Sequence, residues 1–237
     1  MNQTWTAEQL EAHTAETLVE TLTESANGKS SCLTSSLQAE DMVVLHLLQK
    51  HLPDIPVIFL DTGYHFAETY AYRDRMAQEW SIHFNNVLPE TTVAEHEGQF
   101  GKQYLVQPTS CCQIRKVAPL MRSLEPFDIW YTGLRREQSP TRANLKKVEE
   151  HRLPSGKVLL KISPLAAWNW QQVWQYLSAN NIPHLPLYDD GYRSIGCEPC
   201  TQRSLDPANP RAGRWGGRKL ECGIHTFSDP GKTIDPV

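Results

Sequence analysis

Long apolar runs, a basic leader and a secretory layout are all missing from this chain of 237 residues. No stretch approaches the roughly 18 consecutive apolar residues of a membrane-spanning helix, so we expect no membrane as a partner. The first residues, Met1 to Leu22, are polar and acidic, and they lack the basic and then apolar layout of a secretory signal. These absences predict a soluble, cytoplasmic protein.

Signatures of several nucleotide and nucleic-acid binders are also missing. The chain has no Walker loop and no G-x-G-x-x-G motif, which argues against P-loop and dinucleotide-binding proteins. Its net charge is −4, so we expect no nucleic-acid partner and no broad basic face. Basic residues are nevertheless concentrated in segments 135–147 and 203–219, which favours local capture of a small anion. A solvated surface is the alternative.

Short apolar runs alternate with helical patterns. Strands are expected at residues 30–34, 56–61, 82–87, 128–132 and 157–162. Helices are expected at residues 6–24, 66–80 and 170–177, after a Ser35 cap to residue 52, and after a Ser110 cap to residue 124. This alternation predicts α/β architecture with a mostly parallel sheet. We expect an N-terminal helical segment (1–25), one α/β domain (26–200) and a C-terminal tail (201–237).

Six cysteines in a cytoplasmic chain favour metal binding or catalysis over disulfides, because the cytosol keeps thiols reduced. Four of them form two close pairs, Cys111 with Cys112 and Cys197 with Cys200. Four thiolates suit a structural zinc ion and an iron–sulfur cluster equally well, and their spacing does not choose between the two. Unrelated core cysteines are the remaining alternative.

Cys222 has the surroundings of a reactive thiol. It lies in the segment 221–225, close to several glycines, so we expect a mobile tail there. Basic neighbours such as Lys219 favour the thiolate, and an exposed cysteine of low pKa is typical of a nucleophile. An inert tail cysteine is the alternative. Cys32, in contrast, lies in an expected strand and is predicted to be a packed core thiol.

Three loops are candidates for binding a nucleotide. Ser35 and Ser36 form a turn that opens a helix, where hydroxyls and free N–H groups can bind an anion. Asp61 and Thr62 lie at the end of an expected strand, at the sheet edge where open α/β folds bind ligands. Asp61 could accept from an amine or a ribose hydroxyl there, or it could simply form the turn. The stretch 132–142 also follows a strand, and it carries three arginines, which bind phosphate and sulfate oxygens in pairs.

Taken together, these motifs resemble those of the assimilatory adenylylsulfate reductases, the iron–sulfur branch of the phosphoadenylylsulfate reductase family. The resemblance covers most of the chain, from about residue 30 to residue 225. It rests on the segments 35–41, 60–63, 111–116, 132–142, 191–201, 211–215 and 221–225. The chain departs from the family pattern at Arg193, where proline is frequent, and in the short link 216–219, where relatives often carry extra tryptophans.

The resemblance implies a single Rossmann-like adenine-nucleotide domain with a mostly parallel sheet and a mobile C-terminal tail. It implies that Cys222 attacks adenylylsulfate (APS), forms an S-sulfocysteine and releases AMP, after which thioredoxin or a similar dithiol releases sulfite. The implied ligands of a [4Fe–4S] cluster are Cys111, Cys112, Cys197 and Cys200. The expected substrate-binding residues are Ser35, Ser36, Asp61, Thr62, Lys116, Gly133, Arg135, Arg136, Arg142, Arg211, Arg214 and His225.

Three alternatives to APS reduction differ in substrate or class. Reduction of the 3′-phosphorylated substrate (PAPS), alone or alongside APS, is the nearest, but members specialised for PAPS lack the four cluster cysteines. A tRNA-thiolating pyrophosphatase would need a Ser-Gly-Gly-x-Asp-Ser loop, which residues 35–39 do not provide. A non-catalytic, metal-bound nucleotide sensor is the remote alternative. A homo-oligomer is compatible with the sequence, and the first 25 residues have no assigned role.

Overall fold

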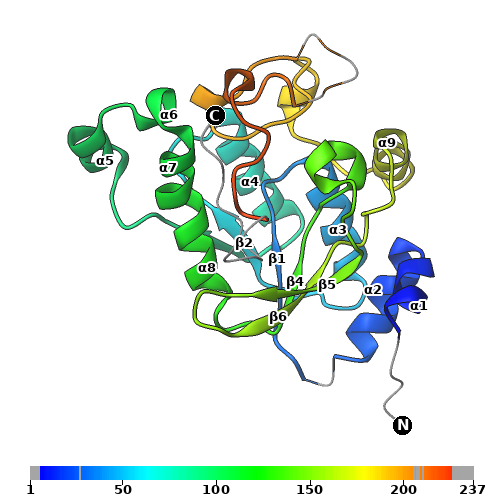
Figure 1. The fold of residues 1–237 in the computed structure, drawn as a ribbon. Coiled ribbons are helices and arrows are strands. Elements are labelled where there is room, and N and C mark those ends of the chain that lie inside the picture. Colours follow the sequence, from blue (N-terminus) through cyan, green and yellow to red (C-terminus); the bar gives the residue numbers. More distant parts are fainter. Residues whose placement is uncertain (1–5, 27, 205, 207–208, 210, 226–237) are drawn as a thin grey trace.

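The computed structural model describes residues 6–26, 28–204, 206, 209 and 211–225, and a central sheet organises them (Figure 1). The strands are β1 (Ser31–Thr34), β2 (Val57–Leu60), β3 (Phe84–Val87), β4 (Ile129–Tyr131), β5 (Val148–Arg152) and β6 (Val158–Ile162). They are ordered β3-β2-β1-β4-β6-β5, and every neighbouring pair is parallel except β5 with β6. The prediction of an α/β fold with a mostly parallel sheet is confirmed.

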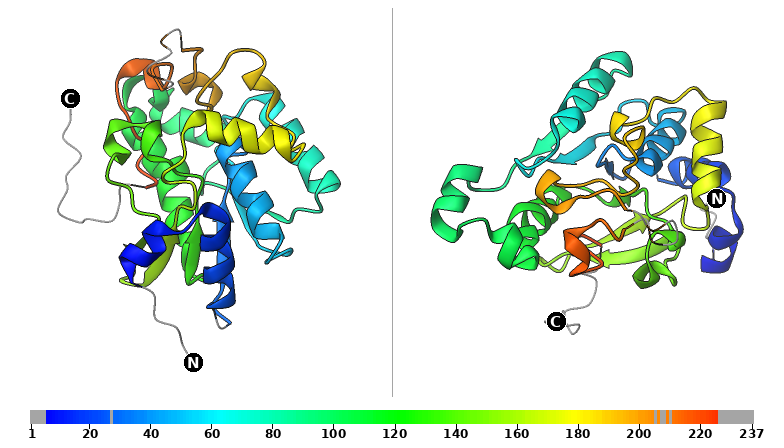
Figure 2. Two further views of the ribbon diagram at one scale, coloured as in Figure 1. Left: turned by 90° about the vertical axis from the view of Figure 1, so that its right-hand side faces the viewer. Right: turned by 90° about the horizontal axis from the view of Figure 1, so that it is seen from above.

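Helices cover both faces of this sheet, as the two views of Figure 2 show. The longer ones are α2 (Ala15–Glu24), α3 (Ala39–Gln49), α4 (Ala67–Glu79) and α9 (Trp170–Ala179). Their apolar residues share one core with Leu33 and Tyr131 of the sheet. Cys32 and Trp130 point to the opposite face and pack against α8 (Ala118–Leu124). Because strand side chains alternate between faces, one short apolar strand serves both cores.

The N-terminal segment is helical, as expected, but it forms two helices instead of one. α1 (Ala7–Ala12) ends before Thr14, whose hydroxyl caps α2 by accepting from the Thr17 N–H. Leu18 and Val19 of α2 are fully buried against the core. The segment therefore packs on the α/β body.

Two predicted helix caps are wrong. α3 begins at Ala39 with Gln38 as its N-cap, because Leu37 takes a φ of 63° and cannot belong to a right-handed helix that starts at Ser35. α7 (Pro108–Cys112) begins before Ser110, with a proline in its first turn. A π-helical turn (Gln113–Val117) then joins α7 to α8.

Two parts of the fold are not predicted by the sequence. β5 carries mainly charged, exposed residues and buries only His151, a pattern that suits an edge strand but reads as a loop. The helices α5 (Val93–Phe100) and α6 (Gln103–Val106) form an arm beside α7. No helix within the described ranges has the length and apolar character needed to cross a membrane.

The tail beyond residue 200 has little regular structure, as predicted. Within its described part, a short antiparallel contact joins the two tail segments around Thr201 and Arg214, in which the Gln202 N–H donates to the Gly213 carbonyl at 2.8 Å. Among the described residues there are five 3₁₀ turns, at Arg136–Gln138, Pro140–Arg142, Pro186–Tyr188, Glu198–Cys200 and Trp215–Gly217. The expected mobility of the tail also concerns residues 226–237, which lie outside the described residues.

Candidate active site

A cavity of about 400 Å³ lies at the carboxyl edge of the sheet. Its floor includes Thr34, Leu60 and Thr132, which end or directly follow β1, β2 and β4. Ligands of open α/β folds bind at this edge, where neighbouring strands lead away to opposite faces. The tail covers the cavity with Arg211, Arg214, Trp215, Cys222, Ile224 and His225.

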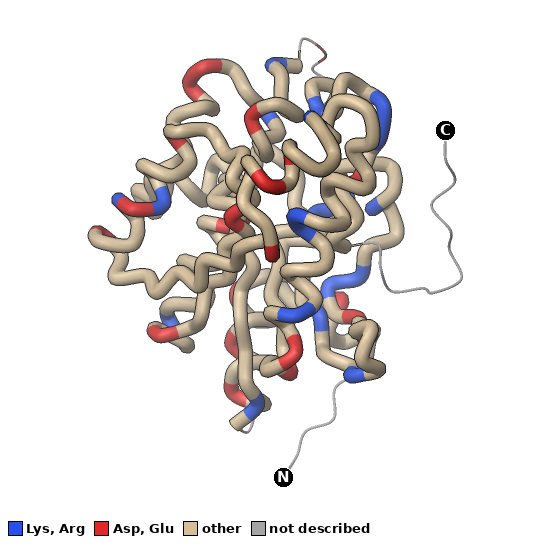
Figure 3. Tube along the Cα trace, turned by 90° about the vertical axis from the view of Figure 1, so that its left-hand side faces the viewer, with Lys and Arg blue, Asp and Glu red and all other residues tan. Residues whose placement is uncertain are grey.

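Charge is concentrated in this cavity although it is mixed over the molecule. Acidic and basic positions are interspersed along the trace in Figure 3. Six cationic side chains line the cavity: Lys116, Arg135, Arg142, Arg193, Arg211 and Arg214. Its carboxylates are Glu40, Asp41 and Glu137. An excess of cations in a partly enclosed cavity favours an anionic ligand.

The structure brings most of the expected substrate-binding residues to this cavity. Those that line it are Ser35, Ser36, Lys116, Gly133, Arg135, Arg142, Arg211, Arg214 and His225, together with Cys222. Asp61 instead accepts from the Tyr70 hydroxyl at 2.6 Å and from the Gly63 N–H. Thr62 lies deeper, with its hydroxyl 3.3 Å from the sulfur of Cys197. Arg136 pairs with Glu11 of α1.

The turn before α3 uses many of its donors within the protein. The Ser36 N–H and hydroxyl donate to the Asp41 carboxylate at 2.7 and 2.8 Å. Burial raises the pKa of Asp41 to about 6, although the hydrogen bonds from Ser36 oppose the rise. Gly133 makes this arrangement possible, because a Cβ there would lie 2.3 Å from the nearer Asp41 oxygen. These internal hydrogen bonds therefore hold the turn rigidly in place at the wall of the cavity.

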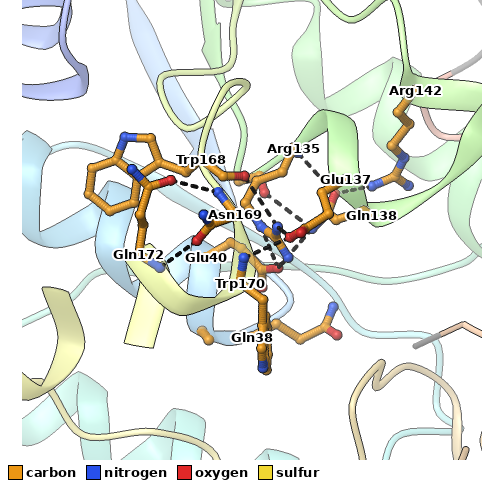
Figure 4. Close-up of polar contacts among 12 residues, drawn as sticks. Gln38, Glu40, Arg135, Glu137, Gln138, Arg142, Trp168, Asn169, Trp170 and Gln172 are labelled. Atoms are coloured by element: carbon orange, nitrogen blue, oxygen red, sulfur yellow. Dashed lines mark hydrogen bonds and ion pairs between the residues drawn. The ribbon is translucent and has the colours of Figure 1, made fainter. Parts of the chain in front are cut away.

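Arg135 is bound by acidic side chains of the cavity wall (Figure 4). Its Nη2 and Nε lie 2.8 and 3.0 Å from Glu40 Oε1, and its Nη1 lies 2.8 Å from Glu137. Gln138 also donates to Glu40, and the Trp170 N–H donates to Glu137. The side chain of Arg135 is only 4% exposed. Since two carboxylates neutralise its charge, Arg135 stabilises the wall more than it attracts an anion.

Arg142 and Arg211 are held by Glu221, which precedes Cys222. Arg142 binds Glu221 with two parallel contacts, Nε to Oε1 at 2.9 Å and Nη2 to Oε2 at 2.6 Å. The Thr141 hydroxyl donates to the same carboxylate at 2.9 Å. Glu221 is not among the expected site residues, although a carboxylate next to the candidate nucleophile Cys222 in an arginine-rich chain is a usable signal.

The four paired cysteines line a second, smaller cavity next to the first. α7 supplies Cys111 and Cys112, and the 3₁₀ turn near the end of the domain supplies Cys197 and Cys200. All four are free thiols. Within the described part of the chain, no three His, Cys, Asp or Glu side chains converge closely enough for a single metal ion. The four thiols therefore line one small cavity together.

Lys116 lines both cavities and joins their electrostatics. Burial lowers the pKa of its ammonium group, but the thiolates of Cys197, Cys112 and Cys222 together outweigh burial, so the pKa is raised. Lys219 of the tail lies close by, with its ammonium 3.3 Å from the sulfur of Cys112. Lys116 thus interacts electrostatically both with paired cysteines and with Cys222.

His225 of the tail packs its ring against the sheet. Its ring stacks on Trp130 with centroids 5.5 Å apart and an interplanar angle of 18°. Burial lowers the pKa of His225 well below its usual value, and the nearby Lys161 and Arg142 lower it further. The imidazole is therefore neutral near pH 7. Its Nδ1 is buried and has no hydrogen-bond partner among the described residues.

An open α/β sheet with a cationic cavity at its carboxyl edge, and a cysteine held over it by a tail, defines a nucleotide-type fold equipped for thiol chemistry on an anion. Residues 30–203 match the model of the phosphoadenosine phosphosulfate reductase domain. The chain belongs to this family.

Relatives of known name agree with this assignment. The chain is 46% identical over 202 residues to adenosine 5′-phosphosulfate reductase of Streptomyces coelicolor, covering 84% of this chain and 83% of the relative. It is 44% identical over 188 residues to the enzyme of that name from Mycolicibacterium smegmatis, covering 78% of both. The fold is similar to phosphoadenylyl-sulfate reductase from Candida auris, with a TM-score of 0.67 at 23% identity over 85% of this chain and all of that one.

Proposed function

We propose that this chain reduces adenylylsulfate to sulfite and AMP in assimilatory sulfate reduction, with Cys222 as the nucleophile. The observation that carries the proposal is the shared cavity, in which Cys222 lies with Lys116 and Arg211 at the carboxyl edge of the sheet. The relatives named adenosine 5′-phosphosulfate reductase support the same substrate.

The proposed reaction needs a thiolate and a stabilised leaving group. The Cys222 sulfur attacks the sulfate sulfur, an S–S bond forms, and the S–O bond to the phosphate of AMP breaks. Arg142, Arg211 and Arg214 hold the phosphate and sulfate oxygens while charge moves onto AMP. A dithiol such as thioredoxin then attacks Cys222, displaces sulfite and leaves as a disulfide, so that thiols supply both electrons.

Movement of the tail, residues 201–237, follows from these two steps. The tail must cover the substrate during the attack and must then expose Cys222 to a protein reductant. Cys222 is half-buried in the closed arrangement described here, which suits the first step. We place the reaction in the cytoplasm, where dithiol reductants are kept reduced.

The donor set of the second cavity fits a [4Fe–4S] cluster held by Cys111, Cys112, Cys197 and Cys200. Four thiolates would also suit a single zinc ion. The resemblance of the cysteine motifs to those of the iron–sulfur branch supports the cluster. When bound, the cluster would supply a fixed local charge, which Lys116 links to the substrate cavity.

PAPS reduction, or acceptance of both substrates, is the alternative. The names of the relatives argue against it, since those at 44–46% identity are called adenosine 5′-phosphosulfate reductase. The four paired cysteines argue the same way, because they match the motifs of the iron–sulfur branch. Sulfite release from APS and PAPS, compared at equal concentration with thioredoxin present, tests the proposal. A preference for PAPS would overturn it.

A further inference from the structure

Glu221 is the strongest feature of the site that the proposed reaction does not use. Its side chain is 10% exposed, yet the residue does not line the substrate cavity. Its carboxylate lies behind the arginines, in contact with Arg142 and Thr141 and 3.7 Å from Arg211 Nη2. Burial raises the pKa of Glu221, but the charges and hydrogen bonds of Arg142, Arg211 and Thr141 together outweigh burial, so the pKa is lowered and the group is ionised.

The geometry leaves Arg142 able to bind Glu221 and a substrate oxygen together. Glu221 uses the Nε and one Nη2 hydrogen of Arg142, and Gln138 accepts from Nη1. Since a guanidinium group has five N–H donors, two remain for the cavity. Glu221 is therefore placed to orient the arginine without competing for its free edge.

Arg211 ties the same stretch of tail from a second side. Its Nε and Nη2 donate to the backbone carbonyl of Leu220, at 3.2 and 2.9 Å. Arg142 belongs to the loop after β4, and Glu221 belongs to the tail, so their contact joins two segments far apart in the sequence. Cys222, the next residue, can move little while this contact holds.

We propose that Glu221 is a positioning residue, which latches the tail onto Arg142 of the body, beside Arg211 of the tail, and so fixes Cys222 over the cavity. The inference rests on the proposed function in taking Cys222 as the nucleophile. The latch joins the attacking thiol and the anion-binding arginines into one unit. When the tail closes, the thiol of Cys222 and the arginines are therefore positioned together.

The test is the variant Glu221→Gln, which keeps the shape of the side chain and removes its charge. Without substrate, alkylation of Cys222 by iodoacetamide, followed by mass spectrometry of its peptide, should be faster by about tenfold, the factor expected when a charge-assisted contact is lost. The single-turnover rate of AMP release from saturating APS, without reductant, should fall by a similar factor. Glu221→Asp should recover part of both effects.

Two controls separate the latch from general damage. Thr141→Val removes one contact to Glu221 outside the cavity and should shift both measurements in the same direction, by less. Glu150→Gln removes an exposed carboxylate of β5 and should shift neither. Unchanged alkylation in Glu221→Gln, or faster alkylation with an unaltered single-turnover rate, would overturn the proposal. If the wild-type chain released no AMP from APS, the proposed function would fail, while alkylation would still decide the latch.

Discussion

Charged residues of the same type in this protein differ in whether a partner within the protein already neutralises their charge. Arg135 and Arg142 belong to the same loop, but two carboxylates neutralise Arg135, whereas Arg142 has N–H donors left for a ligand. Lys116 is surrounded by thiols and lines both cavities. These differences depend on partners from other elements, so residue type alone does not reveal them.

Replacement of the proposed nucleophile gives the first prediction. Cys222→Ser should lower sulfite formation from APS to the level of a blank, because a hydroxyl is not ionised near pH 7 and is a far weaker nucleophile. AMP affinity, measured by calorimetry, should change little, since the cationic side chains remain. Cys32→Ala, which removes a buried thiol outside the cavity, is the control and should keep its activity. Sulfite formation by Cys222→Ser would contradict the assignment.

A second prediction concerns pH and the buried His151. Burial, aided by the nearby Lys161, lowers the pKa of His151 to about 4, and neither ring nitrogen has a partner among the described residues. The unfolded chain then binds more protons below pH 6.5, so stability is full above that pH and is lost as pH falls toward 4. A shift from 6.5 to about 4 corresponds to at most about 3 kcal/mol.

The measurement is the free energy of unfolding, by denaturant titration, at several values between pH 7 and pH 4. The free energy of unfolding of His151→Leu should depend less on pH. The difference in this free energy between the wild-type chain and the variant should therefore change steadily between pH 7 and pH 4. A constant gap would show that His151 does not titrate differently in the folded and unfolded states.

At the scale of helices and strands, hydrophobic periodicity predicts which elements exist better than it predicts where each element begins or ends. The five expected strands are present, because apolar runs such as residues 57–60 must be buried in a sheet covered on both faces. The start of α3 is not predicted, since Leu37 takes a left-handed backbone conformation that only its tertiary contacts impose. β5 is missed for a related reason, because burial of one side chain is enough for an edge strand.

In the candidate site, residue types are likewise easier to predict than the contacts that those residues make. Nine of the twelve expected substrate-binding residues line the cavity, and so does Cys222, because charged and nucleophilic residue types are costly to bury without a purpose. Asp61 and Arg136 share those residue types, but Tyr70 and Glu11 bind them away from the cavity. Such partners come from distant segments, and their pairing is not encoded in local spacing.

Capping gives a prediction for a single element. The Asn169 side chain accepts from the Gln172 N–H at 2.8 Å and begins α9, and the Gln172 side chain accepts from the Asn169 N–H. Asn169→Ala should lower the free energy of unfolding by about 1 kcal/mol, the usual cost of losing a cap. Gln171→Ala, at an exposed position of the same helix, should change it by less than about 0.5 kcal/mol. Equal effects of the two variants would argue against the capping role.

At the scale of the whole molecule, two neighbouring cavities and one tail form a single arrangement. Lys116, Arg214 and Trp215 line both cavities, so a change in the cysteine cavity alters the wall of the substrate cavity. Gly196 allows this packing, because a Cβ there would lie 2.2 Å from the Arg214 guanidinium. We therefore expect a substitution that disrupts the cysteine cavity to impair substrate binding in the neighbouring cavity as well.

The most direct test of the account is sulfite release by the protein purified without oxygen. APS and PAPS would be supplied separately with thioredoxin, and iron and sulfide would be measured in the same sample. We expect a strong preference for APS and about four irons per chain. Activity on PAPS alone would contradict the proposed substrate, and no activity on either substrate despite a full complement of iron would contradict the proposed enzyme.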